Sequence, residues 1–208
     1  MLAGDQRAPG GDVAALWRSL NHGNSPGARG WKQEADRLAR MVSARSDESS
    51  GHHMSDTDAL GLVAALARPD WIAHRRGKGE RAYLTASGTG VELPRESSAG
   101  NAEWLAITEL TRTDGRAADA RSQFFEGSLV RGAIAISEEL TLQAGAGLLS
   151  VREQATWGPD TGRISTRRER ALGAIVLTST PVRTPAALAL TTAMAALPEA
   201  GLGLQSRG

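Results

Sequence analysis

The chain has 208 residues, of which 40% are apolar and 23% charged, a balance typical of a folded globular protein. It contains no cysteine, which excludes disulfide frameworks, thiolate nucleophiles and cysteine-based zinc sites. The N-terminus has no signal-peptide pattern and no run of about 18 apolar residues occurs, so we expect a soluble, cytoplasmic protein. Lysine and arginine together number 24 against 23 for aspartate and glutamate, so any binding to a polyanion must depend on local basic patches.

Apolar side chains recur at helical spacing in three segments of the first third of the chain. These segments are residues 13–20, 31–45 and 58–67. Asp12 precedes the first segment and Asp58 begins the third, and both are N-cap candidates. Pro69 is expected to end the third helix near Ala67, after which Trp71 and Ile72 anchor the exit of the chain.

A polar stretch, residues 46–57, separates the second predicted helix from the third and has no apolar periodicity. It predicts a connector, so we place a domain boundary at its end and expect two regions, residues 1–57 and 58–208. Two short amphipathic helices cannot bury both of their apolar stripes on each other. Residues 1–57 are therefore expected to be the tail of a helical bundle.

Short apolar runs separated by turn residues indicate β-strands from Arg81 onward. The predicted strands are residues 82–86, 90–93, 104–110, 151–157 and 163–170, followed by a buried run at 171–178. Residues 129–136 are compatible with a helix, and Thr184 with Pro185 begins a helix that Pro198 ends. The predicted fold class is α+β, with a helical-bundle tail, a small antiparallel β-barrel of about five strands and a C-terminal helix.

Motifs for nucleotide binding and catalysis are missing from the sequence. A phosphate-binding P-loop requires Gly-x-x-x-x-Gly-Lys-Ser/Thr, but Gly79 follows the only Gly-Lys pair, Gly77-Lys78. The sequence also lacks a DExH motif, a His-Glu-x-x-His zinc motif and a Gly-x-Ser-x-Gly nucleophile elbow. It therefore predicts no catalytic residue, no cofactor-binding residue and no metal ligand.

Two basic clusters, residues 74–81 and 163–170, each contain four basic residues and one glutamate, a net charge of +3. If the hairpin pairs symmetrically about a five-residue turn, Glu153 faces Arg167, while Arg152 faces the like-charged Arg168 on the other side of the sheet. Such an arrangement indicates either bound phosphates or an edge strand that its charges protect from pairing, and the sequence leaves both interpretations open. The candidate nucleic-acid-binding residues are Arg75, Arg76, Lys78, Arg152, Arg168 and Arg170.

Four segments in sequence order resemble the region that follows the motor in HrpB-type ATP-dependent helicases of the DEAH/DExH class. The segments are LVAALARPDWIAHRRG at residues 62–77, YLTASGTG at 83–90, EWLAITEL at 103–110 and RRERALGAIVL at 167–177. In that family a helix ends in a Pro-Asp-containing turn, an arginine run follows, and a Tyr-Leu strand comes next. Trp71 stands where an arginine is usual, and residues 122–147 lack the expected apolar strand and acidic helix.

The resemblance covers roughly residues 12–204 and implies the end of a helical accessory bundle followed by an oligonucleotide-binding-fold-like domain. It places two RecA-like motor domains upstream of Met1, where ATP and magnesium would bind, and a further domain downstream of Gly208. The implied function is that of an accessory C-terminal region of an RNA helicase, which contacts nucleic-acid phosphates without sequence specificity, packs on the motor and is inactive alone. The alternative is a truncated reading frame that acts only as a protein-interaction module. RNA and DNA both remain open as substrates.

Overall fold

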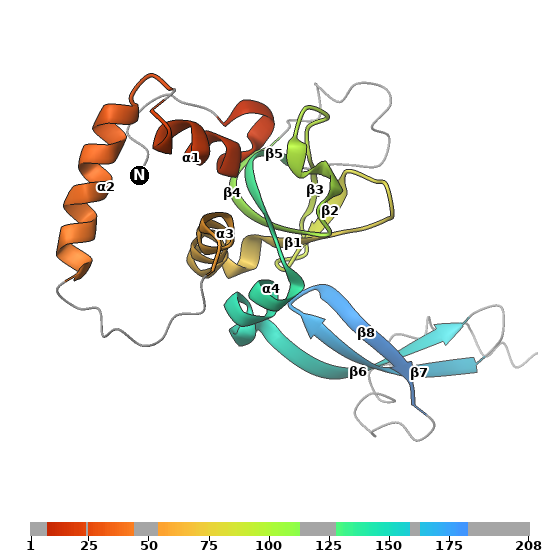
Figure 1. Cartoon of the computed structure of the whole chain (residues 1–208). Coiled ribbons are helices and arrows are strands. Elements are labelled where there is room, and N and C mark those ends of the chain that lie inside the picture. The colour runs from red at the N-terminus through yellow and green to blue at the C-terminus, as the bar shows by residue number, and fades with distance from the viewer. Residues whose placement is uncertain (1–7, 24, 44–53, 113–127, 159–162, 183–208) are drawn as a thin grey trace, which may run out of the picture. The chain divides into compact units, whose positions relative to one another are not determined.

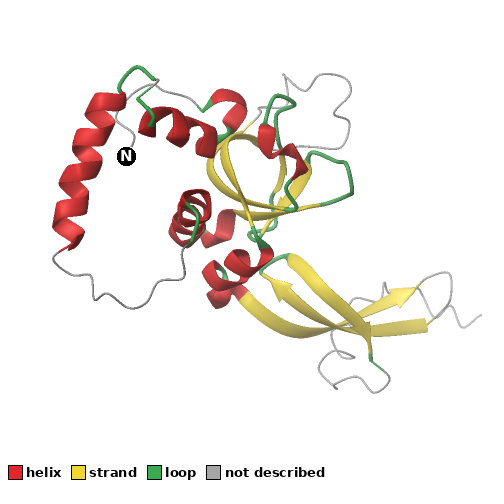
Figure 2. Cartoon of the chain, in the orientation of Figure 1, coloured by secondary structure: helices red, strands yellow, loops and turns green. Residues whose placement is uncertain are grey.

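The computed structural model describes residues 8–23, 25–43, 54–112, 128–158 and 163–182. The fold is α+β and divides into two compact units. Figure 1 labels the helices and strands, and Figure 2 colours the chain by secondary structure. The first unit comprises residues 1–148 and 173–175, and the second comprises residues 149–172 and 176–208. No helix in the described part of the chain is both long enough and apolar enough to span a bilayer.

The first unit contains four α-helices among its described residues, several of them capped by a side chain. They are α1 (Val13–Asn21), α2 (Ala28–Ser43), α3 (Asp56–Ala67) and α4 (Glu138–Ala144), with 3-10 turns at Pro9–Gly11, Pro69–Trp71, Ser98–Asn101 and Ala146–Leu148. Asp12 accepts the predicted cap hydrogen bond from the amide of Ala15 at 2.8 Å. The cap of α3 is Ser55, not Asp58 as predicted, because Ser55 Oγ accepts from the Asp58 amide and donates to the Asp58 carboxylate.

The five strands of the first unit close into a barrel in the order β1-β2-β3-β5-β4. They are β1 (Ile72–Arg75), β2 (Ala82–Thr85), β3 (Gly90–Glu92), β4 (Trp104–Arg112) and β5 (Ser128–Ile136). Strand β1 pairs with both β2 and β4, which closes the barrel, and every pair is antiparallel except the parallel pair β3–β5. Buried residues that include Tyr83, Val91, Leu105, Ile107 and Val130 fill the interior. The predicted small barrel with helices is confirmed.

Helices α1 and α3 both lie on the outside of this barrel. Gly61 of α3 lies against β5, where an added Cβ would be 3.5 Å from Ile134 Cγ2. Asp12, the cap of α1, bridges to Ala133 of β5 and accepts a hydrogen bond from Ser98 Oγ in the connection before β4. Helix α1 is therefore attached to the barrel through a buried carboxylate.

The second unit contains a three-stranded sheet in the order β6-β7-β8. The strands are β6 (Leu149–Gly158), β7 (Arg163–Leu172) and β8 (Ile175–Pro181). The predicted hairpin of residues 151–157 and 163–170 is present, but it belongs to this separate sheet. The barrel closes instead with β1, which the sequence analysis did not predict, and with β5.

Residues 129–136 form strand β5 and not the helix considered from the sequence. The β-branched Val130, Ile134 and Ile136 suit a strand, and β5 pairs with β4 along most of its length. The acidic helix α4 follows directly, so the segment contains both elements that the resemblance led us to expect and that seemed to be missing. The predicted C-terminal helix from Thr184 lies outside the described residues, as does most of the predicted connector.

Candidate nucleic-acid interface

Two arginines of the first basic cluster hold a loop of the barrel in place. Arg75 donates from Nε and Nη2 to the carbonyl oxygen of Ala102, at 3.1 and 2.6 Å, and from Nη2 to that of Gly100 at 3.0 Å. Arg81 donates to the carbonyl oxygens of Pro94 at 2.6 Å, Arg95 at 2.8 Å and Ser97 at 3.3 Å. These two cations therefore stabilise the connection between β3 and β4, and Arg75 is only partly available to a ligand.

The other basic residues of this cluster lie on the exposed loop between β1 and β2. Arg76 and Lys78 are both exposed, and Lys78 makes no hydrogen bond or ion pair within the described residues. The carboxylate of Glu80 folds back on Gly77, where an added Cβ would be 2.6 Å from Glu80 Cδ. Gly79 has φ of +82°, which permits the tight turn. The loop therefore presents Arg76 and Lys78 to solvent.

The register of the β6–β7 hairpin differs by one residue from the prediction. Gly158 pairs with Arg163, so the loop contains four residues and not five. Arg152 consequently faces Glu169, with Nε 3.2 Å from Oε2, and Glu153 faces Arg168, with Oε1 2.7 Å from Nη2. The predicted like-charge pair of Arg152 and Arg168 is wrong, and two ion pairs of opposite charge take its place.

The same shift redistributes the hairpin arginines between the two faces of the sheet. Arg168 and Arg170 share one face because they are two residues apart in β7. Arg152 lies on the opposite face, so the predicted common face of all three arginines is also wrong. Arg167 lies on that opposite face too, where Nε and Nη2 donate to Oγ and the carbonyl oxygen of Ser179 at 2.7 and 2.9 Å. Arg170 is exposed, and its side chain has no hydrogen bond or ion pair within the described residues.

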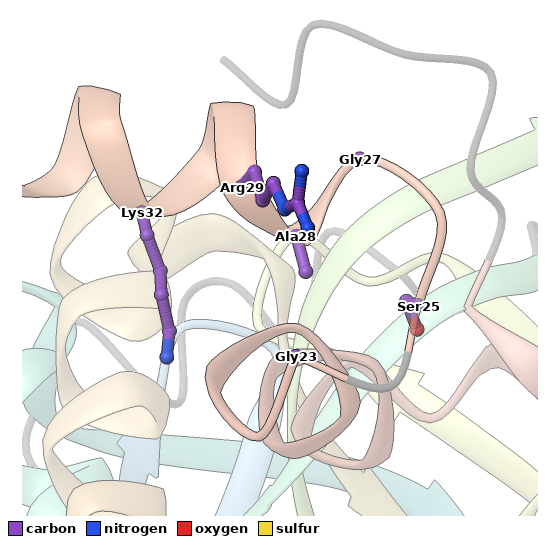
Figure 3. A pocket seen from close by; sticks show the side chains of 6 residues that line it. All are labelled: Gly23, Ser25, Gly27, Ala28, Arg29 and Lys32. Carbon is purple, nitrogen blue, oxygen red and sulfur yellow. The ribbon is translucent and has the colours of Figure 1, made fainter.

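A shallow pocket that the sequence analysis missed lies at the turn between α1 and α2 (Figure 3). Its volume is about 360 Å³, and it is lined by Gly23, Ser25, Gly27, Ala28, Arg29 and Lys32. Gly23 and Gly27 both have positive φ, and Arg29 and Lys32 follow in the first two turns of α2. The recurrence of glycines directly before two helical cations is the signal that predicts such a basic turn.

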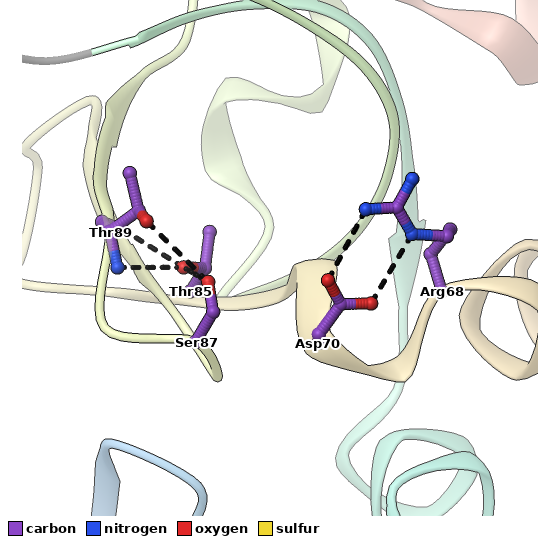
Figure 4. A network of polar contacts seen from close by, with 5 residues as sticks. All are labelled: Arg68, Asp70, Thr85, Ser87 and Thr89. Atoms are coloured by element: carbon purple, nitrogen blue, oxygen red, sulfur yellow. Dashed lines mark hydrogen bonds and ion pairs between the residues drawn. The ribbon is translucent and has the colours of Figure 1, made fainter.

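Trp71 is a structural anchor and offers little free ring surface. Its ring packs on the barrel core, and the guanidinium carbon of Arg68 lies 3.7 Å from the ring centroid. Figure 4 shows Arg68 held by the carboxylate of Asp70, at 3.2 Å from Nη2 to Oδ2, and the separate hydroxyl cluster of the β2–β3 turn. The predicted anchoring of the chain after α3 is confirmed.

No family model and no curated protein sequence matches the chain, but solved structures with a similar fold exist. The crystal structure of the E. coli DExH-box NTPase HrpB aligns over 92% of this chain with a TM-score of 0.63 and 20% identity. A crystal structure of the Escherichia coli DEAH/RHA helicase HrpB aligns over 93% with a TM-score of 0.61 and 20% identity. The chain has the fold of a part of HrpB.

The matched region is 21% of the HrpB chain, so this protein spans about a fifth of the length of HrpB. HrpB is also the family that the four sequence segments of residues 62–177 resemble. The order of these sequence segments and the fold therefore both point to HrpB. At 20% identity, the agreement with HrpB defines the fold, and the function has to be argued from the residues.

Proposed function

We propose that this chain is an accessory region of an ATP-dependent helicase, in which it contacts nucleic-acid phosphates and packs on the motor domains. The observation that carries the proposal is the alignment of 92% of the chain with HrpB, whose structures are described as those of a DExH-box NTPase and a DEAH/RHA helicase. ATP and magnesium then belong to the motor, and this chain extends the path of the nucleic acid. RNA is the substrate that the family resemblance favours.

The topology of the barrel supports this proposal. Five strands in the order β1-β2-β3-β5-β4, with a single parallel pair between β3 and β5, are consistent with an oligonucleotide-binding fold. Such barrels bind oligonucleotides on the face of their second and third strands. Arg76 and Lys78 lie on the loop that leads into β2. A strand of nucleic acid on this face would pass these cations.

The exposed cations provide the chemistry for binding phosphates without reading sequence. We propose Arg76, Lys78, Arg168 and Arg170 as the main contacts, since all four are exposed. Arg75 is expected to contribute less because carbonyl oxygens already occupy its donors, and Arg152 because it lies on the face of the sheet opposite Arg168 and Arg170. Contacts of this kind release counter-ions from the polymer, so affinity falls as salt rises.

The apolar stripe of α2 supports packing on another part of a longer protein. Ala28, Trp31, Ala35 and Leu38 recur at the three- and four-residue spacing of a helix-packing seam. Only the first two contact α1, whereas Leu38 is 49% exposed and the neighbouring Met41 is 63% exposed. Most of the stability of helices in proteins comes from packing of their amphipathic face, so this surface fits a helix of the motor region. The same surface favours the alternative function, a protein-interaction module without nucleic-acid contact.

A binding titration of the isolated chain separates the two functions. Fluorescence anisotropy with labelled single-stranded RNA and DNA of mixed sequence should show binding that weakens steeply with salt and depends little on base order. Calorimetry with ATP should show no binding, since the chain has no phosphate-binding loop. Failure to bind either nucleic acid at low salt would leave only the interaction module. Micromolar binding of ATP would contradict the assignment to an accessory region.

A further inference from the structure

One face of the second sheet is open to solvent and carries cations and hydroxyl groups together. The amide of Val182 donates to the carbonyl oxygen of Thr166 at 2.9 Å, which sets these two residues opposite each other on adjacent strands. Counting back in antiparallel register places Thr180 beside Arg168, and Thr178, two residues before Thr180 in β8, lies on the same face of the strand. The hydrogen bond from Thr180 Oγ1 to the carbonyl oxygen of Arg168, at 3.4 Å, agrees with this register.

We call this surface the arginine–threonine face and define it by Arg168, Arg170, Thr178 and Thr180. All four residues are exposed. Val151 pairs with Arg170 on the neighbouring strand and is 67% exposed, so the face remains uncovered at the β6 side as well. No element of the second unit packs on these side chains within the described residues.

On the opposite face of the sheet, the two arginines whose side chains the structure describes both have partners. Arg152 forms an ion pair with Glu169, and Arg167 donates twice to Ser179. On the arginine–threonine face, Arg168 uses Nε and Nη2 on a single oxygen of Glu153, and Arg170 uses no donor within the described residues. Arg170 therefore offers a guanidinium without a partner among the described residues, and it lies on the arginine–threonine face.

We propose that the arginine–threonine face binds the phosphate backbone of an extended single-stranded polynucleotide, an inference that rests on the proposed function and locates its second contact surface. Residues two apart in a strand are separated by about 6.8 Å, so Arg168 and Arg170 contact different phosphates. Thr178 donates its hydroxyl group to the same backbone, whereas the hydroxyl group of Thr180 already donates to the carbonyl oxygen of Arg168. Arginine together with threonine is a common set of phosphate donors in nucleic-acid interfaces.

The shape of the surface favours a polynucleotide over an acidic peptide. Peptides usually add to the edge of a sheet or fill a groove, where their own backbone or side chains are recognised. The arginine–threonine face is the middle of an exposed sheet, and its donors lie in rows on β7 and β8. A phosphate chain that crosses the strands can reach both rows.

Two variants and a control test this inference by anisotropy with fluorescein-labelled oligothymidylate over a salt series. Arg170→Gln should weaken binding and make the log–log salt slope shallower by about 0.7, the value for one phosphate contact on a single strand. Thr178→Val should weaken binding by about two- to fivefold through a lost hydrogen bond and leave the slope unchanged. Arg167→Gln removes the same charge from the opposite face and should change neither quantity.

The outcomes distinguish this inference from the proposed function. Absence of binding by the unmodified chain would contradict the proposed function itself. Two results would overturn the assignment of the arginine–threonine face but not the proposed function. Either all the variants bind as tightly as the unmodified chain, or Arg167→Gln weakens binding as much as Arg170→Gln does. If poly-glutamate at an equal concentration of charge displaced the oligonucleotide, the arginine–threonine face would be a site for acidic peptides and not for a polynucleotide. Thermal melts monitored by circular dichroism verify that each variant is folded.

Discussion

Gly100 leaves free the space that the guanidinium of Arg81 occupies, because a Cβ atom at position 100 would lie 2.5 Å from Arg81 Nη2. Arg81 in turn donates to three carbonyl oxygens of the loop between β3 and β4. Ser98 in the same loop donates to Asp12, the cap of α1. A glycine in one connection of the barrel thus supports the attachment of the N-terminal helix.

Gly100→Ala should therefore destabilise the protein by about 1 kcal/mol, because the displaced guanidinium leaves partly buried carbonyl oxygens without a donor. Urea denaturation followed by tryptophan fluorescence measures the change. Gly147→Ala is the matched control, since an added Cβ there meets nothing within 4 Å and its φ is not positive. Equal stability of the two variants would refute the role given to Arg81.

Gly173, in the turn between β7 and β8, should tolerate substitution even less well. Its φ is +57°, and an added Cβ would collide with the carbonyl oxygen of Ala86. Gly173→Ala should cost at least about 2 kcal/mol, because backbone strain and a steric clash act together. Gly79→Ala, with φ of +82° and open space around it, should show only the strain, about 1 to 2 kcal/mol. The same denaturation assay compares them, and a smaller loss for Gly173→Ala than for Gly79→Ala would contradict the packing of this turn.

Glu153 engages the guanidinium of Arg168 and so limits its contact with phosphates. Neutralising Glu153 should therefore strengthen the binding of nucleic acid. Glu153→Gln removes a carboxylate 2.7 Å from Arg168 Nη2 and should steepen the log–log salt slope by up to about 0.7. Stability should change by no more than about 1 kcal/mol, because Arg168 is exposed. Glu169→Gln on the opposite face is the control, with 13% exposure of its carboxylate side chain against 17% for Glu153. Equal binding by both variants and the unmodified chain would count against Arg168 as a contact.

Helices α1 and α2 should be less protected from hydrogen exchange than the barrel core in the isolated chain. Hydrogen exchange should be faster at the amides of Trp17, Trp31 and Leu38 than at those of Leu105 and Ile107 in the barrel core. Leu38→Ala should change stability by no more than about 0.5 kcal/mol, whereas Leu105→Ala should cost about 2 to 5 kcal/mol. Protection of α2 equal to that of the barrel would show that its apolar stripe needs no partner.

Much of the fold could be predicted from the sequence because local signals and packing agree. The cap Asp12, the end of α3 before Pro69 and the strands from residues 82 to 110 follow from periodicity and turn chemistry. Strand β5 was missed because Gly132 interrupts a short apolar run that fits either a helix or a strand. Only pairing with the distant β4 decides between the two.

The candidate site could be predicted in composition but not in arrangement. The two basic clusters are visible in the sequence, yet a hairpin loop of four residues instead of five moves Arg152 to the other face of the sheet. Arg75 is a candidate contact in the sequence, but the carbonyl oxygens that accept from it, at residues 100 and 102, lie far along the chain. Such long-range acceptors leave no local pattern, so sequence alone could not separate the structural arginines from the exposed ones.

The salt dependence of nucleic-acid binding by the double variant Arg168→Ala and Arg170→Ala tests the account most directly. With labelled single-stranded RNA of mixed sequence, the variant should bind more weakly at low salt, and its log–log slope should be shallower by about 1.4, which corresponds to two lost phosphate contacts. Arg167→Ala should retain the slope of the unmodified chain. An unchanged affinity and slope in the double variant would contradict the account and show that these arginines protect the sheet and bind no phosphate.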